Sequence, residues 1–102
     1  MYEVHLSSNA EKFLKKLDQN LSERIIERLK RLSDDPVPPD SKFIERSSEG
    51  KIFRYRIGEY RAIYQLKDIE KVVLITTIEH RSKIYSKYIL REEEAQYSTQ
   101  PF

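Results

Sequence analysis

Apolar and polar positions alternate with two different periodicities in the first third of the chain. Residues 2–6 alternate with a period of two, which predicts a short β-strand. Apolar residues then recur at helical spacing in two blocks, which are separated by a short link at 18–20. Each block begins with a helix-capping pattern, at 8–11 and at 20–23. Two helices ending near Ser33 are therefore predicted to form an antiparallel hairpin.

In the second half of the chain the apolar positions recur with the two-residue period of β-strands. A loop with three prolines at 34–40 cannot lie inside a helix. Strands are predicted at 41–45, 52–57, 60–66 and 72–78. From Ile84 to Ile89 the spacing is helical again. The fold class is therefore α+β: an N-terminal strand, a helical hairpin, an antiparallel sheet of three to four strands, and a short C-terminal helix.

The central predicted hairpin separates its residues onto two faces. With Gly58-Glu59 as a type II′ loop, Ile57 opposes Tyr60 and Arg56 opposes Arg61. One face is then apolar and is expected to face the core. The other face carries three arginines, Arg54, Arg56 and Arg61, with no acidic residue of the hairpin strands beside them. Like charges directly opposite each other destabilise a hairpin, so these arginines indicate an anion site; arginine stems that merely cover a solvated face are the alternative.

The composition excludes several kinds of function. The 102 residues contain no cysteine, which excludes disulfides, thiolate metal sites and a cysteine nucleophile. With two histidines and two glycines, we expect no metal site, no glycine-rich phosphate loop and no cofactor. No apolar stretch approaches the ~20 residues of a membrane helix, and no leader pattern is present, so a cytoplasmic protein is expected. We expect one domain at 1–95 and a loose tail at 96–102.

Positive charge is concentrated in two separated segments. The net charge of the chain is only +2, but residues 51–67 and residues 80–91 each carry a net charge of +4. The strand at 72–78 is expected to run antiparallel to 60–66, so its end returns to the hairpin turn. The groups expected to meet at that end of the sheet are Arg61, Arg56, His80, Arg81 and Tyr85. A cationic site of this kind suits a phosphate backbone.

RNA offers a cleavage chemistry that needs no nucleophile from the protein. Its 2′-OH can attack the adjacent phosphate if a base, an acid and cations for the phosphorane charge are in place. Arginines supply such cations through bidentate contacts, and no carboxylate triad accompanies them, so a metal-free mechanism fits better than a two-metal one. Histidine is the side chain type most suited to exchange a proton at neutral pH, so His80 is a candidate acid or base. His5 is expected to be structural, and Glu59 to be a solvated turn residue.

Three parts of the chain resemble the RelE/ParE toxin superfamily, and within it the RelE-type ribosome-dependent mRNA endonucleases. They are the strand and helical hairpin at 2–33, the run from Phe53 to Tyr64, and the run from Ile78 to Tyr85. The resemblance implies that Arg61 and Arg81 bind and neutralise the scissile phosphate. It also implies that Tyr85 stacks on an mRNA base or orients the 2′-OH. Arg54 and Arg56 stand where the family often has lysine, and arginine is a poor general base because it stays charged.

The expected function is therefore a toxin of a type II toxin–antitoxin system that cleaves translated mRNA. The expected catalytic residues are Arg61, Arg81, Tyr85 and His80, and the expected RNA-binding residues are Arg54, Arg56, Lys51 and Lys83. The expected partners are a RelB-like antitoxin in a hetero-oligomer, the A site of the small ribosomal subunit, and mRNA, with no membrane. A ParE-like inhibitor of DNA gyrase and a non-catalytic RNA-binding module are the alternatives.

An antitoxin is expected to block RNA entry by one of two routes. The two basic segments would attract an acidic or mixed-charge chain, and grooves beside the helical hairpin could receive an amphipathic helix. By the first route it contacts or displaces the segment from Ile84 to Ile89 and moves Tyr85. By the second it covers Arg54, Arg56 and Arg61 directly.

Overall fold

The computed structural model describes residues 1–84 and 100–101. Its elements follow the predicted α+β order along the chain, and the loop at 34–40 separates the helices from the main sheet. They are β1 (Glu3–Leu6), α1 (Ser8–Lys16), α2 (Gln19–Lys30), the short 3₁₀ helix η1 (Arg31–Ser33), β2 (Ser41–Ser47), β3 (Gly50–Ile57), β4 (Tyr60–Lys67), β5 (Val72–His80) and β6 (Gln100–Pro101). The predicted C-terminal helix and Tyr85 lie outside the described residues. None of the described helices is long and apolar enough to cross a bilayer.

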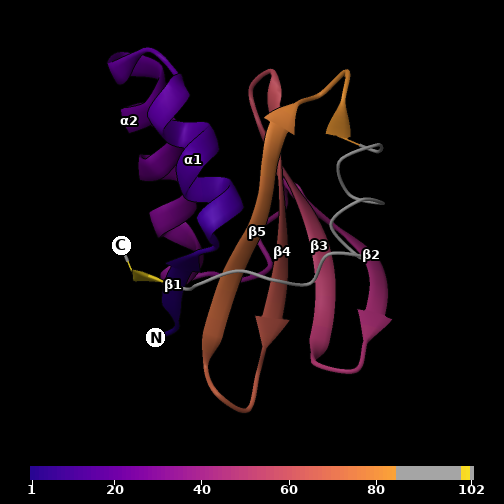
Figure 1. The fold of residues 1–102 in the computed structure, drawn as a ribbon. Helices are drawn as coiled ribbons and strands as arrows, with labels where there is room; N and C mark the ends of the chain where they lie inside the picture. The colour runs from indigo at the N-terminus through magenta and orange to yellow at the C-terminus, as the bar shows by residue number, and fades with distance from the viewer. Residues whose placement is uncertain (85–99, 102) are drawn as a thin grey trace.

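The strands form one sheet in the order β2-β3-β4-β5-β1-β6. β2 to β5 pair antiparallel, as predicted, while β1 lies parallel to β5, with Glu3 opposite Val72. The helical hairpin connects β1 back to the sheet and covers one of its faces (Figure 1). Within the expected tail, Gln100–Pro101 pairs antiparallel with β1. The division at residue 95 stays a prediction, because residues 96–99 and 102 lie outside the described part.

Both helices begin earlier than the capping patterns predict. The N-cap of α1 is Ser7, whose Oγ accepts a hydrogen bond from the Ala10 N–H at 3.1 Å, and not Ser8. The same Oγ donates to the carbonyl of Thr76 on β5 at 2.9 Å. This tertiary contact explains why Ser7 and not Ser8 is the N-cap, and it could not be predicted from the local sequence. α2 is capped by the carboxylate of Asp18, which accepts from two backbone N–H groups of the first turn.

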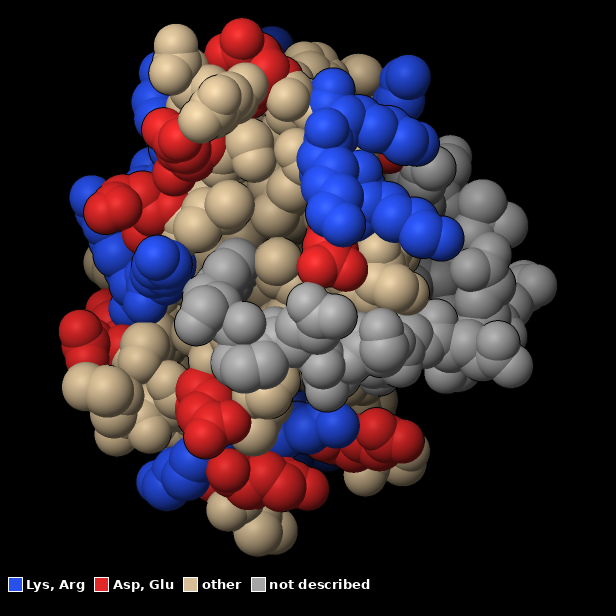
Figure 2. Space-filling model, turned by 60° about the vertical axis from the view of Figure 1, so that its left-hand side comes forward, with Lys and Arg blue, Asp and Glu red and all other residues tan. Residues whose placement is uncertain are grey.

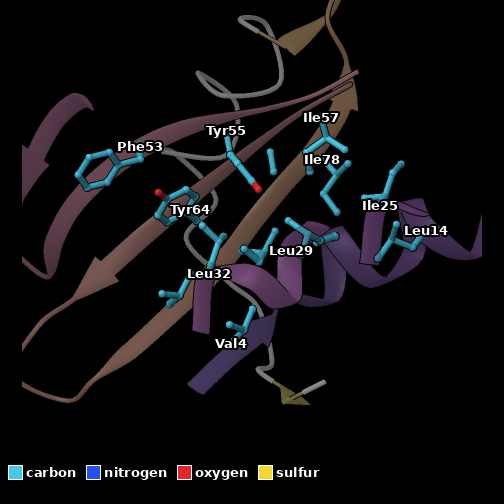
Figure 3. Packing of buried hydrophobic residues seen from close by; sticks show 14 of the residues in the cluster. Val4, Leu14, Ile25, Leu29, Leu32, Phe53, Tyr55, Ile57, Tyr64 and Ile78 are labelled. Carbon is cyan, nitrogen blue, oxygen red and sulfur yellow. The ribbon is translucent and has the colours of Figure 1, made fainter. Parts of the chain in front are cut away.

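The main core lies between the helical hairpin and one face of the sheet (Figure 3). The predicted apolar face of the β3–β4 hairpin supplies Phe53, Tyr55, Ile57, Ala62, Tyr64 and Leu66 to it. The buried Tyr64 hydroxyl donates to the Pro36 carbonyl at 2.6 Å, which ties the proline loop to the sheet. On the opposite face Ile52, Ile63 and Ile84 form a smaller cluster. The apolar faces of both helices and of β3 to β5 thus hold the helical hairpin against the sheet.

Candidate functional site

The β3–β4 hairpin has the register that the two-residue loop predicts. Ile57 pairs with Tyr60, and Arg56 pairs with Arg61. Gly58 has a φ of 59°, while Glu59 does not have a positive φ, as a type II′ turn requires. Side chains directly opposite each other share a face, so Arg56 and Arg61 project from the face away from the helices, and Arg54 lies two residues along.

Arg61 is the best-anchored member of this group. Its Nη1 donates to the carbonyls of Gly58 and Tyr60, each at 2.9 Å, which holds the guanidinium at the turn. Partial burial, together with the positive charges of Arg56, Arg54 and Arg81, lowers the pKa of Arg61 from its ordinary value. The guanidinium stays charged at neutral pH. Three arginines thus repel Arg61, Glu59 partly offsets their effect, and a bound anion would relieve the repulsion further.

A β-bulge decides what β5 adds to this face. The β4–β5 register shifts between Ile63 and Tyr64, and Thr76 is the extra residue on β5. The Thr76 hydroxyl donates to the Ile63 carbonyl at 3.1 Å and stabilises the bulge. Beyond it Arg61 pairs with Glu79; in the unshifted register it would oppose Ile78 instead. The bulge therefore brings a carboxylate onto the arginine face.

Glu79 is the acidic neighbour that the sequence analysis does not expect. Its side chain is buried, and its Oε1 accepts a hydrogen bond from the His80 backbone N–H at 3.1 Å. The hairpin strands carry no acid beside the arginines, as predicted, and the carboxylate comes instead from the neighbouring strand β5. The facing of β5 could not be predicted, since the turn before it allows either register.

His80 lies at the expected end of the sheet but on its other face. It pairs with Tyr60, whose ring also packs edge-on against Phe13 of α1, and the His80 and Tyr60 ring centroids are 5.5 Å apart. The Ser82 backbone N–H donates to His80 Nδ1 at 3.2 Å. His80 therefore lies on the helix side of the sheet, whereas Arg56 and Arg61 lie on the other side.

Arg81 follows β5 directly and is joined to the hairpin turn. Its backbone N–H donates to the Glu59 carbonyl at 2.8 Å, and its Nε lies 3.1 Å from Glu59 Oε1. Glu59 is exposed, as expected, but it is ion-paired and not merely solvated. Figure 2, which brings the helix side of the molecule forward, shows a group of basic side chains at the upper right of that side, whereas basic and acidic groups mix over the rest of it.

The remaining expected site residues do not all reach this end. Lys51 pairs with Leu66 at the far end of the hairpin, five positions from Arg56, or about 16 Å along the strand. Lys83 is exposed in the turn after β5, where its N–H donates to the His80 carbonyl at 2.9 Å. Tyr85 lies outside the described residues. The structure thus brings Arg54, Arg56, Arg61 and Arg81 together and leaves Lys51 apart.

A cavity of about 500 Å³ lies between α2 and the hairpin turn. Its lining combines apolar and charged side chains: Leu21, Ile25 and Ile57, the arginines Arg24, Arg28 and Arg31, and the acidic residues Glu27 and Glu59. Arg28 is the connecting residue: its Nη2 lies 2.9 Å from Asp40 Oδ2 and donates to the Arg56 carbonyl at 3.2 Å. The sequence analysis expects grooves beside the helical hairpin but names none of the residues that line this cavity.

The chemistry available at the end of the sheet is anion binding. Arginines from β3, β4 and the end of β5 offer planar N–H donors, which suit the oxygens of a phosphodiester. Glu79 and His80 are titratable groups that border the arginines from the two faces. Within the part of the chain described, no group of three or more His, Asp or Glu side chains is placed to hold a metal ion.

Comparison with known proteins places this arrangement in a family. The family model described as the ParE toxin of the type II toxin–antitoxin system parDE matches residues 4–85. No curated protein sequence matches the chain significantly.

Solved structures show the same fold. A chain of the RelE–RelB complex of Pyrococcus horikoshii OT3 is 28% identical, with a TM-score of 0.72 over 80% of this chain and 97% of that one. A chain of the toxin–antitoxin complex RelBE2 of Mycobacterium tuberculosis is 30% identical, with a TM-score of 0.67 over 78% and 98%. The isolated RelE toxin of E. coli is 25% identical, with a TM-score of 0.53 over 89% and 98%.

Proposed function

Because the chain belongs to the RelE/ParE superfamily and is a toxin of a type II toxin–antitoxin system, we propose that it arrests translation by cleaving mRNA in the ribosomal A site. The observation that carries this proposal is the group of four arginines formed by Arg61 and the three that act on its charge, which lies at one end of the sheet and offers guanidinium donors of the kind that bind phosphate. The likeness to RelE toxins supports the choice of RNA as the substrate.

The proposed reaction is an internal transfer at one phosphodiester, and it uses no metal cofactor. The 2′-oxygen forms a bond to phosphorus, and the bond from phosphorus to the 5′-oxygen breaks. A base takes the 2′ proton and an acid gives a proton to the 5′-oxygen, which leaves a cyclic phosphate on one fragment and a hydroxyl on the other. Arg61 and Arg81 stabilise the charge that develops on the phosphorane, with Arg54 and Arg56 holding the backbone beside it.

The residues proposed to transfer protons are chosen by their position next to the arginines. Glu79 borders the arginines on their own face, and His80 reaches the same end from the helix side. His80 and Tyr85 remain the proposed partners of Arg61 and Arg81. Lys83, in the turn after β5, is proposed to contact the RNA backbone; Lys51, at the far end of the hairpin, is proposed to contact it only outside the scissile phosphate.

Primer extension on a translated message tests the proposal. An mRNA is translated with and without the toxin, and the positions of new 5′ ends are mapped. We expect breaks that repeat with the phase of the codons, because the ribosome presents one codon at a time. Breaks without codon phase would contradict cleavage in the A site.

Inhibition of DNA gyrase is the second candidate function, and the match to the ParE family model favours it. A gyrase inhibitor acts by binding, so it would leave the mRNA unbroken while DNA is linearised. A non-catalytic RNA-binding module would leave both intact. Examining cells that express the toxin for both mRNA breaks and linear DNA therefore distinguishes the three functions.

We propose a RelB-like antitoxin as the partner that restrains the toxin, in a hetero-oligomer. The complexes of P. horikoshii and M. tuberculosis, which contain RelB with RelE, support this. The cavity beside α2 is lined by apolar residues, three arginines and two glutamates, so it suits an amphipathic helix that places acidic residues opposite the arginines.

Hydrogen exchange on the toxin alone and on the complex measures where the antitoxin binds. We expect increased protection in residues 51–67 and in the segment from 80 onward, because covering either basic segment would block RNA. Arg28 and its neighbours on α2 should also gain protection if the cavity is occupied. Unchanged protection across both basic segments would place inhibition elsewhere on the toxin.

A further inference from the structure

The turn residue Glu59 is joined to Arg81 at two points. The Arg81 backbone N–H donates to the Glu59 carbonyl at 2.8 Å, and the Arg81 Nε lies 3.1 Å from Glu59 Oε1. The same oxygen is 3.9 Å from Nε2 of His80. The Glu59 and Arg81 side chains are 64% and 60% exposed, so solvent and solutes reach the pair.

A carboxylate and a phosphate compete for the same donors of a guanidinium. Both anions accept hydrogen bonds from its N–H groups in the plane of the group. The Nε donor of Arg81 faces Glu59, so a phosphate that needs this donor must first displace the carboxylate. Glu59 also lines the cavity that holds Arg24, Arg28 and Arg31, where a displaced carboxylate remains close to positive charge.

We propose that Glu59 is a resident competitor for the RNA phosphate at Arg81, so that it sets how tightly the toxin binds RNA. The inference rests on the proposed function, because it takes RNA as the ligand. Glu59 acts through Arg81 and is a positioning residue. An exposed ion pair is weak and is screened by salt, so an RNA backbone held by several arginines at once displaces it more readily than a single small anion does.

Binding of an RNA that cannot be cleaved tests the competition without depending on catalysis. The probe is a fluorescent single-stranded oligoribonucleotide with methylated 2′ hydroxyls, and its affinity is measured by anisotropy at several salt concentrations. We expect Glu59→Gln to bind about two- to fivefold more tightly at low ionic strength, the range that exposed ion pairs permit. The gain should shrink as salt is added.

The chain offers a matched control at the other end of the sheet. Glu49 is also 64% exposed and lies 3.5 Å from the Lys67 Nζ, so Glu49→Gln makes the same charge change in a similar ion pair. We expect it to leave RNA affinity almost unchanged. In an Arg81→Ala background, the gain from Glu59→Gln should disappear, because the group that the carboxylate masks is gone.

The outcomes separate this inference from the proposed function. If wild type binds the probe and Glu59→Gln does not bind it more tightly, Glu59 is no competitor, although RNA remains a ligand. An equal gain in the Arg81→Ala background, or with Glu49→Gln, would show a general effect of net charge and overturn the inference. If no variant binds the probe, both the inference and an RNA-directed function are wrong.

Discussion

Arg61→Ala should reduce mRNA cleavage by ~10²–10³ and abolish growth arrest, the loss typical of removing one donor to transition-state charge. Arg61 is the arginine that the other three surround, and two hydrogen bonds to the turn carbonyls fix its guanidinium at 2.9 Å. A fixed donor needs no reorganisation when charge develops on the phosphorane. Cleavage is measured by primer extension on a translated message, with toxicity followed by growth after induction.

Two controls separate loss of charge from loss of fold. The two hydrogen bonds to the turn contribute about 1 kcal/mol each, so the Tm of Arg61→Ala should fall by about 10 °C or less, which leaves the protein folded at growth temperature. Arg46→Ala removes an exposed arginine from the far end of β2 and should leave toxicity intact. A fully toxic Arg61→Ala would contradict the proposed cleavage site, and so would an equal loss in Arg46→Ala.

Free RNA should be cut at least ~10²-fold more slowly than the same message held in a translating ribosome. Arginines bind a phosphate of any nucleotide, and no group among the described residues is seen to fix the 2′-OH relative to a general base. An error of about 1 Å in such positioning can cost ~10² in rate. The ribosome would hold the codon and so supply the missing alignment.

The measurement compares initial cleavage rates of one mRNA, free and in programmed ribosomes, at saturating toxin. Saturation matters because it separates alignment from simple binding. The non-cleavable probe described above provides the binding constant needed to choose that concentration. Equal rates on free and ribosome-bound RNA would mean that the toxin aligns its substrate alone, and would remove the ribosome from the proposal.

Local turn chemistry made the arginine hairpin predictable. A two-residue loop with Gly58 first permits few registers, so the pairing of Arg56 with Arg61 could be predicted from the sequence. The alternation of apolar residues on the same strands identified the core face for the same reason. These features depend on residues close together in the chain.

The contribution of β5 could not be predicted in the same way. Which face of the sheet each residue of β5 occupies depends on the bulge at Thr76. The Thr76 hydroxyl donates to the Ile63 carbonyl, and the Thr76 carbonyl accepts from the Ser7 hydroxyl, so both contacts join residues that are distant in the sequence. The bulge places Glu79 beside Arg61 and His80 beside Tyr60. The sequence analysis did not know of this bulge, so it could not state which residues of β5 share the arginine face, and it did not place Glu79 there.

The parallel pairing of β1 with β5 has a consequence for the toxin's own synthesis. Glu3 pairs with Val72, 69 positions further along the chain, so β1 cannot pair until the ribosome has synthesised β5. Contacts between such distant residues form late in folding. The ribosome releases the helical hairpin first, and the sheet that positions Arg61 and Arg81 closes only after β5 has emerged. A nascent chain that ends before β5 therefore lacks the assembled group of arginines, because Arg81 follows β5 directly and β5 completes the sheet on which Arg61 lies.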